Sequence, residues 1–273
     1  MPSPRWINRA PGNPRLLAAA PFALLLACYL GGSSVRLAAN PNDKLMPPPT
    51  VMAETWSGMA LEEDPRTGDV LFWSDTRASL ARLGMGLAIA TSLALVLGLA
   101  IGMLPHAESL LGPFVTAISM VPALAVLPIL FIVFGLDELS KVMLIVIGVL
   151  PFMVRDLAQR IREIPEEQWI KAQTLGAGGL QLASRVILPQ ALPRLIDSLR
   201  LSLGPAWLFL ISAEAISATG GLGYRIFLVR RYMAMDVILP YVAWITLLAF
   251  ASDLALRALR RNRYPWVDAE GKG

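Results

Sequence analysis

Cysteine and histidine are nearly absent from this chain, which contains one of each, Cys28 and His106. A single cysteine excludes an intrachain disulfide framework. Because the two residues are far apart in the sequence, they offer no ligand cluster for a metal ion. Cys28 stands in an apolar run, where we expect a small membrane-buried residue. No G-x-S-x-G motif accompanies His106, which we expect in an interfacial loop between two spans rather than in a hydrolase site.

Charged residues are also scarce. Only 16% of the residues are charged, and the mean hydropathy is +0.57. Hydrophobic residues make up 55% of the chain, a larger share than in ordinary soluble domains. The formal net charge is +4, yet no dense basic run is interleaved with aromatic residues. Composition therefore indicates a lipid bilayer as the surrounding solvent, and it predicts no nucleic acid partner.

A nucleotide-binding loop is missing as well. The only Gly-Lys pair is Gly271-Lys272, and Trp266 occupies the position where a G-x-x-x-x-G-K-[ST] loop begins with glycine. We therefore expect no ATPase activity and no bound cofactor on this chain.

Long uncharged apolar windows are what the sequence does contain, and they predict an all-α membrane protein with about six transmembrane helices. The windows are Leu16–Val35, Leu83–Leu104, Ser109–Leu136, Val142–Val154, Leu201–Thr219 and Val237–Ser252. A signal peptide is the alternative for the first window, but no clear small-x-small cleavage site follows Leu30, which favours a retained anchor.

Three of these windows have features of their own. Gly98 and Gly102 have the small-xxx-small spacing that lets two helices approach closely in lipid. The window Ser109–Leu136 contains three prolines, which predict one kinked helix whose freed carbonyls suit a transport pathway. The window Val142–Val154 is so short that Lys141 and Arg155 would have to snorkel toward the membrane surfaces.

Six spans place both termini on one side of the membrane. Lys and Arg are more abundant in segments 1–15, 155–200 and 257–273 than in the remaining polar segments, so the positive-inside rule favours cytoplasmic termini. The predicted organisation is a cytoplasmic tail 1–15, a membrane domain 16–256 and a basic cytoplasmic tail 257–273.

The polar segment 155–200 is too long for a simple hairpin and is expected to fold. Pro165, Glu166 and Glu167 resemble a helix start, which predicts a helix over Pro165–Leu175. The Gly-rich run that begins at Gly176 should end it, and a second helix, Leu180–Leu188, should stop before Pro189. By composition, these helices either dock on a partner or lie on the membrane surface.

Glu214 is the one acid inside the fifth window, about 20 Å from the cytoplasmic face at 1.5 Å per residue. An intramembrane carboxylate indicates either a pathway or gate position, or a structural role as a neutral group or an ion pair with Arg225. A carboxylate repels anions, which argues against direct contact with an anionic solute. Predicted pathway residues, chosen from kinks and polarity, are Met120, Pro122, Ser212 and Glu214. The run Gly220–Gly223 should break the helix and begin a short external element.

Two runs resemble the cytoplasmic EAA loop of ABC-importer permeases: Ala172–Ala177, which includes Gly176, and Val186–Pro193, which includes Leu-Pro. The nitrate, sulfonate, taurine and bicarbonate branch of that family is further indicated by Leu45–Val51, Pro122–Pro128, Gly135-Leu136 and Gly221–Tyr224.

The resemblance implies an inner-membrane permease subunit of a bacterial importer for a small anionic solute. Its implied partners are a second permease copy, two ATPase subunits that hold ATP and Mg, and an extracytoplasmic solute-binding protein. In such permeases the loop inserts into a groove on the ATPase, which assigns coupling to Lys171, Ala172, Leu175, Gly176, Ala177, Leu188 and Pro189. Ile170-Lys171-Ala172 replaces the Glu-Ala-Ala of the motif, so Glu166 or Glu167 would have to substitute for its glutamate.

The alternative function is a stand-alone secondary transporter or channel. Such a protein would be expected to show internal repeats or several intramembrane charges.

Overall fold

The computed structural model describes residues 14–41, 43–63 and 68–270, and these ranges contain helices and connecting turns but no strand. The helices in chain order are α1 (Pro14–Ala39), α2 (Pro49–Leu61), α3 (Leu71–Met103), α4 (Pro105–Ser119), α5 (Ala123–Phe134), α6 (Glu138–Arg162), α7 (Glu166–Thr174), α8 (Gly179–Leu182), a π-helical segment (Ala183–Ile187), α9 (Leu188–Ser217), α10 (Leu222–Arg230), α11 (Met235–Arg263) and α12 (Pro265–Glu270). Most of the predicted tail 1–15 and the last three residues of the basic tail lie outside the described ranges.

Within those ranges, five helical segments are long and apolar enough to cross a membrane: α1, α3, α6, the continuous stretch from α8 to α9, and α11. α4 and α5 pass the same test together, but their axes bend by 97° at the break between them. The prediction of an all-α protein with about six spans is confirmed. The prediction of a single kinked helix for the third window is wrong, because α4 ends at Ser119 and α5 begins anew after Pro122, a residue that lacks an N–H donor.

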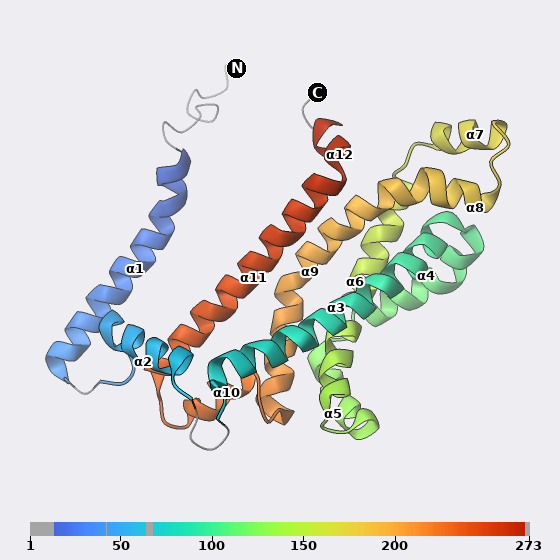
Figure 1. Ribbon diagram of the computed structural model, residues 1–273. Helices are drawn as coiled ribbons and strands as arrows, with labels where there is room; N and C mark the ends of the chain where they lie inside the picture. The colour runs from blue at the N-terminus through green and yellow to red at the C-terminus, as the bar shows by residue number, and fades with distance from the viewer. Residues whose placement is uncertain (1–13, 42, 64–67, 271–273) are drawn as a thin grey trace, which may run out of the picture.

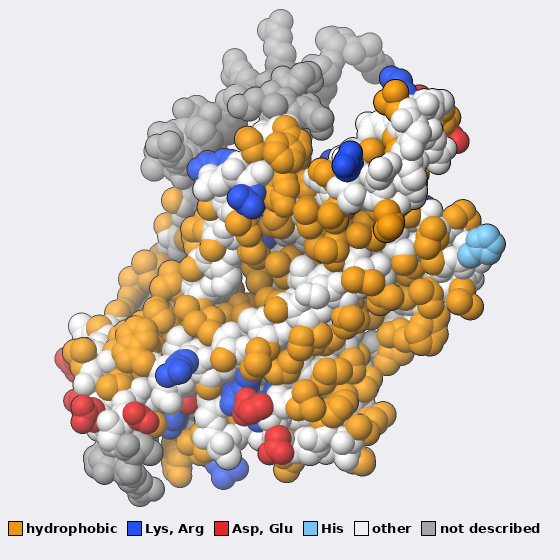
Figure 2. All heavy atoms as spheres, turned by 45° about the vertical axis from the view of Figure 1, so that its right-hand side comes forward, with side chains coloured by type: hydrophobic (Ala, Val, Ile, Leu, Met, Phe, Trp, Pro, Cys, Tyr) orange, Lys and Arg blue, Asp and Glu red, His pale blue; other side chains and the backbone are white. Residues whose placement is uncertain are grey.

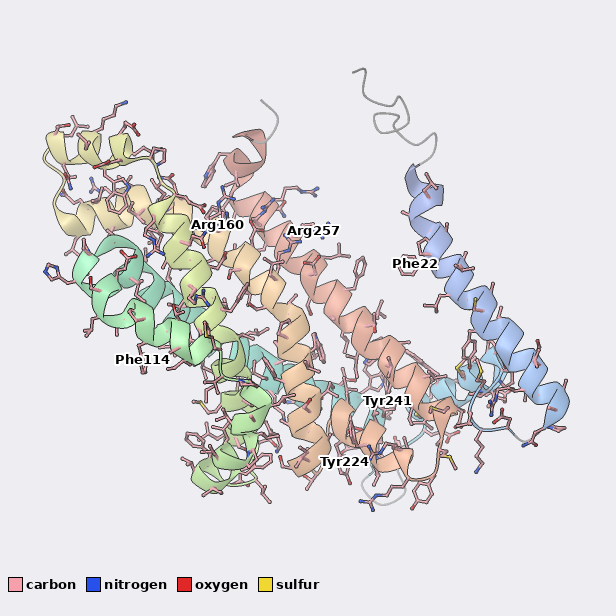
Figure 3. All side chains as sticks on the ribbon, turned by 180° about the vertical axis from the view of Figure 1, so that it is seen from behind. Phe22, Phe114, Arg160, Tyr224, Tyr241 and Arg257 are labelled. Carbon is pink, nitrogen blue, oxygen red and sulfur yellow. The ribbon has the colours of Figure 1, made fainter. Side chains whose placement is uncertain are left out.

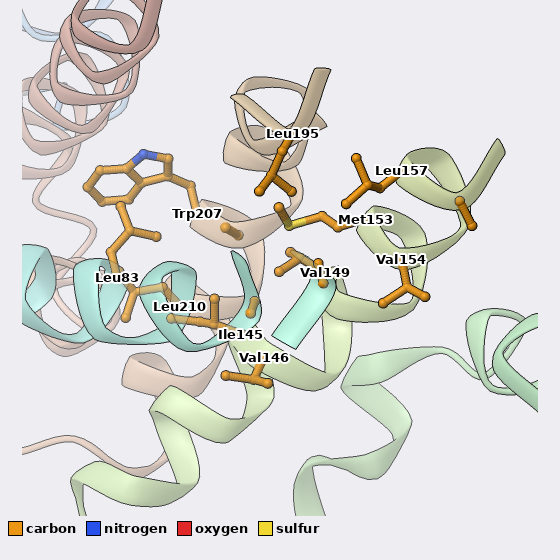
Figure 4. Close-up of a cluster of buried hydrophobic side chains, with 14 of the residues drawn as sticks. Leu83, Ile145, Val146, Val149, Met153, Val154, Leu157, Leu195, Trp207 and Leu210 are labelled. Atoms are coloured by element: carbon orange, nitrogen blue, oxygen red, sulfur yellow. The ribbon is translucent and has the colours of Figure 1, made fainter. Parts of the chain in front are cut away.

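The core lies where α3, α6 and α9 pack together (Figure 4). Ile145, Met153 and Leu157 of α6 are buried there against Leu83 of α3 and Leu210 of α9.

Two glycines let α3 approach α6. A Cβ atom at Gly98 would lie 2.8 Å from Leu157, and one at Gly102 would lie 2.8 Å from Ile161, closer than real Cβ contacts allow. The small-xxx-small prediction is therefore confirmed, with α6 as the partner helix.

The fourth predicted span is longer than expected. α6 covers 25 residues, and Lys141 lies inside the protein with only 2% of its surface exposed. Its Nζ donates to Glu138 Oε1 at 3.1 Å and to the Leu136 carbonyl at 3.4 Å. The prediction that Lys141 snorkels is wrong, because Glu138, one turn earlier, neutralises it where it lies.

α7 agrees with the predicted helix at Pro165–Leu175 and ends in the turn at Gly176, whose φ is +83°. The predicted stop before Pro189 is wrong. Residues Ala183–Ile187 form a π-type turn, and the chain then continues without a break into α9. A widened turn accommodates the proline, because Pro189 has no N–H donor and its ring would clash with the carbonyl one turn earlier in a regular α-helix.

Figure 1 shows α7, α8, α12 and the start of α1 at one end of the molecule. α10 and the start of α6 lie at the other end, near the labelled Tyr224 in Figure 3, whereas Arg160 and Arg257 lie toward the α7 end. Between the ends, hydrophobic side chains cover much of the surface (Figure 2). His106 lies in the first turn of α4 rather than in the expected loop, because Pro105 begins that helix.

Candidate functional site

Three sets of residues are candidates for function: a cluster of buried charges, the α7–α8 segment and the α4–α5 bend. The first set lies at the α10 end and joins four helices. Its carboxylates are Asp75, Glu138 and Glu214, and its cations are Arg82, Lys141 and Arg225. We call these residues the buried charge network.

Glu214 lies at the centre of the network, and none of its surface is exposed. Its carboxylate accepts hydrogen bonds from Arg82 Nη1 at 2.6 Å, from the Ser79 hydroxyl at 2.7 and 2.9 Å, and from the Gly223 N–H at 2.8 Å. Every oxygen of this buried acid therefore has a partner, as a carboxylate inside a protein requires.

Arg82 connects this centre to α6. Its guanidinium also forms an ion pair with Glu138 and donates to the Gly220 carbonyl at 2.8 Å. Glu138 in turn binds Lys141, so the charge extends from α9 through α3 to the first turn of α6. Charges of opposite sign alternate along this path, so each buried charge has a neighbour that neutralises it.

The amino end of α10 closes the network. The Gly221 N–H donates to Asp75 Oδ1 at 2.7 Å, and the Leu222 N–H donates to the Ser79 hydroxyl at 2.9 Å. Arg225 Nε donates to Asp75 Oδ2 at 2.8 Å. Burial of Arg225 acts to lower its pKa, but the hydrogen bond and charge of Asp75 more than offset this, so the pKa lies above its ordinary value. Arg225 is therefore charged at neutral pH.

These contacts correct one expectation for Glu214. Its ion-pair partner is Arg82 and not Arg225, which pairs with Asp75. α9 ends at Ser217 and the glycines after it start α10, as predicted, but the turn folds back over Glu214 instead of exposing it. Its complete burial within the chain supports the structural alternative.

Sequence reasoning missed the α3 side of the network. Asp75, Ser79 and Arg82 recur at helical spacing and therefore lie on one face of α3. An acid, a hydroxyl and an arginine on one face of a predicted spanning helix form the signal that could have indicated a buried partner for Glu214.

The second candidate set is the α7–α8 segment, which contains the predicted coupling residues except Leu188 and Pro189. Glu166 and Glu167 lie in the first turn of α7, and Lys171 and Ala172 lie in its last turns. Leu175, Gly176 and Ala177 form the turn that follows, where the Ala177 N–H donates to the Ala172 carbonyl at 3.0 Å. Leu188 and Pro189 begin α9.

Both ends of this segment are attached to spanning helices. α7 follows the end of α6 directly, and Gln190 Nε2 of α9 donates to Gln168 Oε1 of α7 at 2.9 Å. Two apolar side chains project at the free end, where Leu175 is 88% exposed and Leu180 is 87% exposed. The segment is thus a folded projection with an apolar tip.

The third candidate set lies at the α4–α5 bend. Met120 is 74% exposed there, and Pro122 is also exposed. Ser212 is half-buried on α9, and its hydroxyl donates to the Leu208 carbonyl of the same helix at 2.7 Å. The structure does not bring the four predicted pathway residues to one surface, because Glu214 is buried under α10.

The described part of the chain holds no group of three or more His, Cys, Asp and Glu side chains suited to a metal ion. The geometry is that of a helical membrane protein with a rigid, charge-bonded end and a projecting helical segment at the other end.

Comparison with known proteins agrees with this description. Residues 90–264 match the family model described as "Binding-protein-dependent transport system inner membrane component". The taurine transport system permease protein TauC of Escherichia coli is 36% identical over 198 residues, 72% of each chain. The putative aliphatic sulfonates transport permease protein SsuC of Bacillus subtilis is 28% identical over 222 residues, covering 81% of this chain and 78% of the relative.

Among solved structures, a chain of the MetNI methionine ABC transporter in an inward-facing conformation has the same fold. The TM-score is 0.55 at 22% sequence identity, over 72% of this chain and 99% of that one. From the family match and the TauC relationship, the chain belongs to the binding-protein-dependent transport system inner membrane components and is a multi-pass permease subunit of an ATP-binding-cassette importer.

Proposed function

We propose that this permease imports a small anion of the sulfonate or nitrate class as a homodimer. It is driven by two ATPase subunits and supplied by an extracytoplasmic binding protein. In this proposal the ATPase subunits hold ATP and Mg, and this chain binds no cofactor. The substrate class is supported by the names of the relatives, which specify taurine and aliphatic sulfonates.

The observation that carries the mechanism is the apolar tip of the α7–α8 segment. Leu175 and Leu180 project on either side of the Gly176 turn, between the end of α6 and the start of α9. Apolar side chains grouped on a folded projection are typical of a surface that fits a partner's groove. We infer that this groove belongs to the ATPase subunit and that the segment transmits its motion to α6 and α9.

Co-purification tests the docking. Replacing Leu175 and Leu180 together by Asp should abolish recovery of the ATPase with the permease. Leu61→Asp, at an exposed apolar position of α2 near the other end, serves as the control. Undiminished recovery of the ATPase with the double variant would favour the alternative that the segment lies on the membrane surface.

Orientation is a separate part of the proposal, in which the α7–α8 segment and both termini are cytoplasmic. Because Cys28 is the only cysteine, Cys28→Ser gives a background for site-directed labelling. A cysteine introduced at Gln181 should react with an impermeant thiol reagent in inverted vesicles and not in intact spheroplasts. The reverse pattern would overturn the orientation.

Transport itself is tested with the permease, ATPase and binding protein reconstituted in liposomes. Taurine or nitrate uptake should require ATP. Uptake that persists without ATP or without the ATPase subunits would favour the stand-alone secondary transporter.

A further inference from the structure

A groove of about 280 Å³ lies beneath the α4–α5 bend, between the end of α4 and one side of α6. Its walls include Ile118, Ser119 and Val121 from the bend and Pro151 and Phe152 from α6. The polar groups of α6 in this groove are Arg155, Asp156 and Gln159. An arginine, a hydroxyl, an amide and the Asp156 carboxylate thus face a groove whose other walls are apolar side chains and backbone.

Arg155 differs from the arginines that follow it on α6. Arg160 pairs with Asp156 and Glu163, and Arg162 pairs with Glu108 of α4. No carboxylate lies within ion-pair distance of Arg155 in the described ranges, and its guanidinium instead donates to the Ser119 hydroxyl at 2.7 Å. That contact uses one of five guanidinium N–H donors. Asp156, the nearest acid in sequence, is engaged by Arg160 at 3.6 Å.

The position of Arg155 suits a solute path. It precedes the end of α6 at Arg162 by about 10 Å at 1.5 Å per residue, so it lies within the α7 half of this span. Arg155 and Gln159 also line a second groove of about 480 Å³, which includes Thr116 and Gly112 of α4. The side chain of Arg155 therefore borders two adjoining grooves at one level of α6.

We propose that Arg155 contacts the anion during translocation and selects for oxyanions, an inference that rests on the proposed import of a sulfonate or nitrate. A planar guanidinium presents paired N–H donors that match two oxygens of a sulfonate or nitrate group. The Ser119 hydroxyl holds the guanidinium in the groove until the anion arrives. Glu214 does not oppose this, because Arg82 neutralises it.

The first measurement is solute taken up per ATP hydrolysed, in liposomes that contain the whole importer. Arg155→Gln should lower taurine or nitrate uptake per ATP by about tenfold or more, because a charge-assisted contact is lost. Stimulation of the ATPase by the loaded binding protein should persist, and Arg155→Lys should retain more uptake than Arg155→Gln. Arg77→Gln, at an exposed position near the start of α3, should have the uptake per ATP of the wild type.

Two further arms separate an anion contact from other roles of Arg155. Ser119→Ala removes the hydrogen bond but keeps the charge, so it should reduce uptake much less than Arg155→Gln. An equal loss would mean that Arg155 only fastens α4 to α6, which would overturn the proposal. A defect seen only in liposomes with anionic phosphatidylglycerol, and not in zwitterionic phosphatidylcholine, would assign the guanidinium to anionic lipid headgroups and would also overturn it.

A binding measurement does not depend on turnover. In the Cys28→Ser background, nitrate or taurine should slow the reaction of an anionic thiol reagent with the thiol introduced by Ser119→Cys. Adding Arg155→Gln should remove that protection, and unchanged protection would contradict the proposal. If the wild-type importer takes up neither nitrate nor taurine, the proposed function itself fails. If the wild-type importer takes up either solute and the Arg155→Gln variant has the same uptake per ATP, only the inference about Arg155 fails.

Discussion

Arg82 of α3 and Glu214 of α9 form an ion pair at 2.6 Å in which the carboxylate is completely buried. The pair joins two spanning helices that are far apart in the sequence, and through Glu138 and the Gly220 carbonyl it also holds α6 and the start of α10. The α10 end of the permease is therefore held together by buried electrostatic contacts, whereas the α7–α8 segment projects from the other end with an exposed apolar tip.

Removal of Arg82 should destabilise the protein strongly. Arg82→Leu leaves Glu214 buried without its cation, which we expect to cost about 3–5 kcal/mol of unfolding free energy. Thermal melting in detergent, followed by tryptophan fluorescence, measures the loss. Arg77→Leu is the matched control, since Arg77 is exposed on the same helix. Equal melting temperatures for the two variants would contradict a stabilising role for the network.

Gly221 should not tolerate a side chain. Its φ is +125°, and a Cβ atom there would lie 2.6 Å from Glu214 Cδ and 2.7 Å from Arg82 Nη1. We expect Gly221→Ala to cost at least about 1–3 kcal/mol from backbone strain alone. Gly220→Ala is the comparison, because its Cβ would meet only Asp75 Oδ1 at an ordinary 3.5 Å. Melting curves that place the Gly220 variant below the Gly221 variant would be inconsistent with this geometry.

The close approach of α3 and α6 predicts a third difference. Gly98→Val should lower stability by about 1–3 kcal/mol, because the added methyl groups force Leu157 out of its packing position. Gly84→Val on the same helix should have a much smaller effect, since no atom lies within 4 Å of a Cβ at that position. Folded yield after detergent extraction and the melting temperature provide the measurement. A similar loss at both positions would indicate a general intolerance of valine in α3.

Gly176 predicts an effect on coupling rather than on folding. Its φ of +83° costs an L-residue about 1–2 kcal/mol, although no neighbouring atom would obstruct a Cβ. Gly176→Ala should therefore tilt α8 relative to α7 and reduce uptake per ATP in the reconstituted importer, while Gly176→Asn should be milder. Gly178→Ala, at an extended backbone position, should leave coupling intact. Wild-type coupling in Gly176→Ala would show that the angle of this turn is unimportant.

Several features follow from the sequence by itself. Apolar windows depend on local composition, and they predicted the all-α membrane fold. The helix at Glu166–Thr174 and the turn at Gly176 were also predictable, because acidic residues at a helix start and glycine at its end act through neighbouring backbone groups. The resemblance of Ala172–Ala177 and Val186–Pro193 to the EAA loop indicated the family that residues 90–264 match.

The tertiary structure decided which charges meet. Lys141 was expected at the membrane surface, and Arg225 was the one ion-pair partner considered for Glu214, but Lys141 is buried beside Glu138 and Glu214 faces Arg82. The energy of a buried charge depends on partners supplied by other helices, and such contacts between distant segments leave no local pattern in one sequence. The groove around Arg155 is decided in the same way, because it exists only where the α4–α5 bend packs against α6.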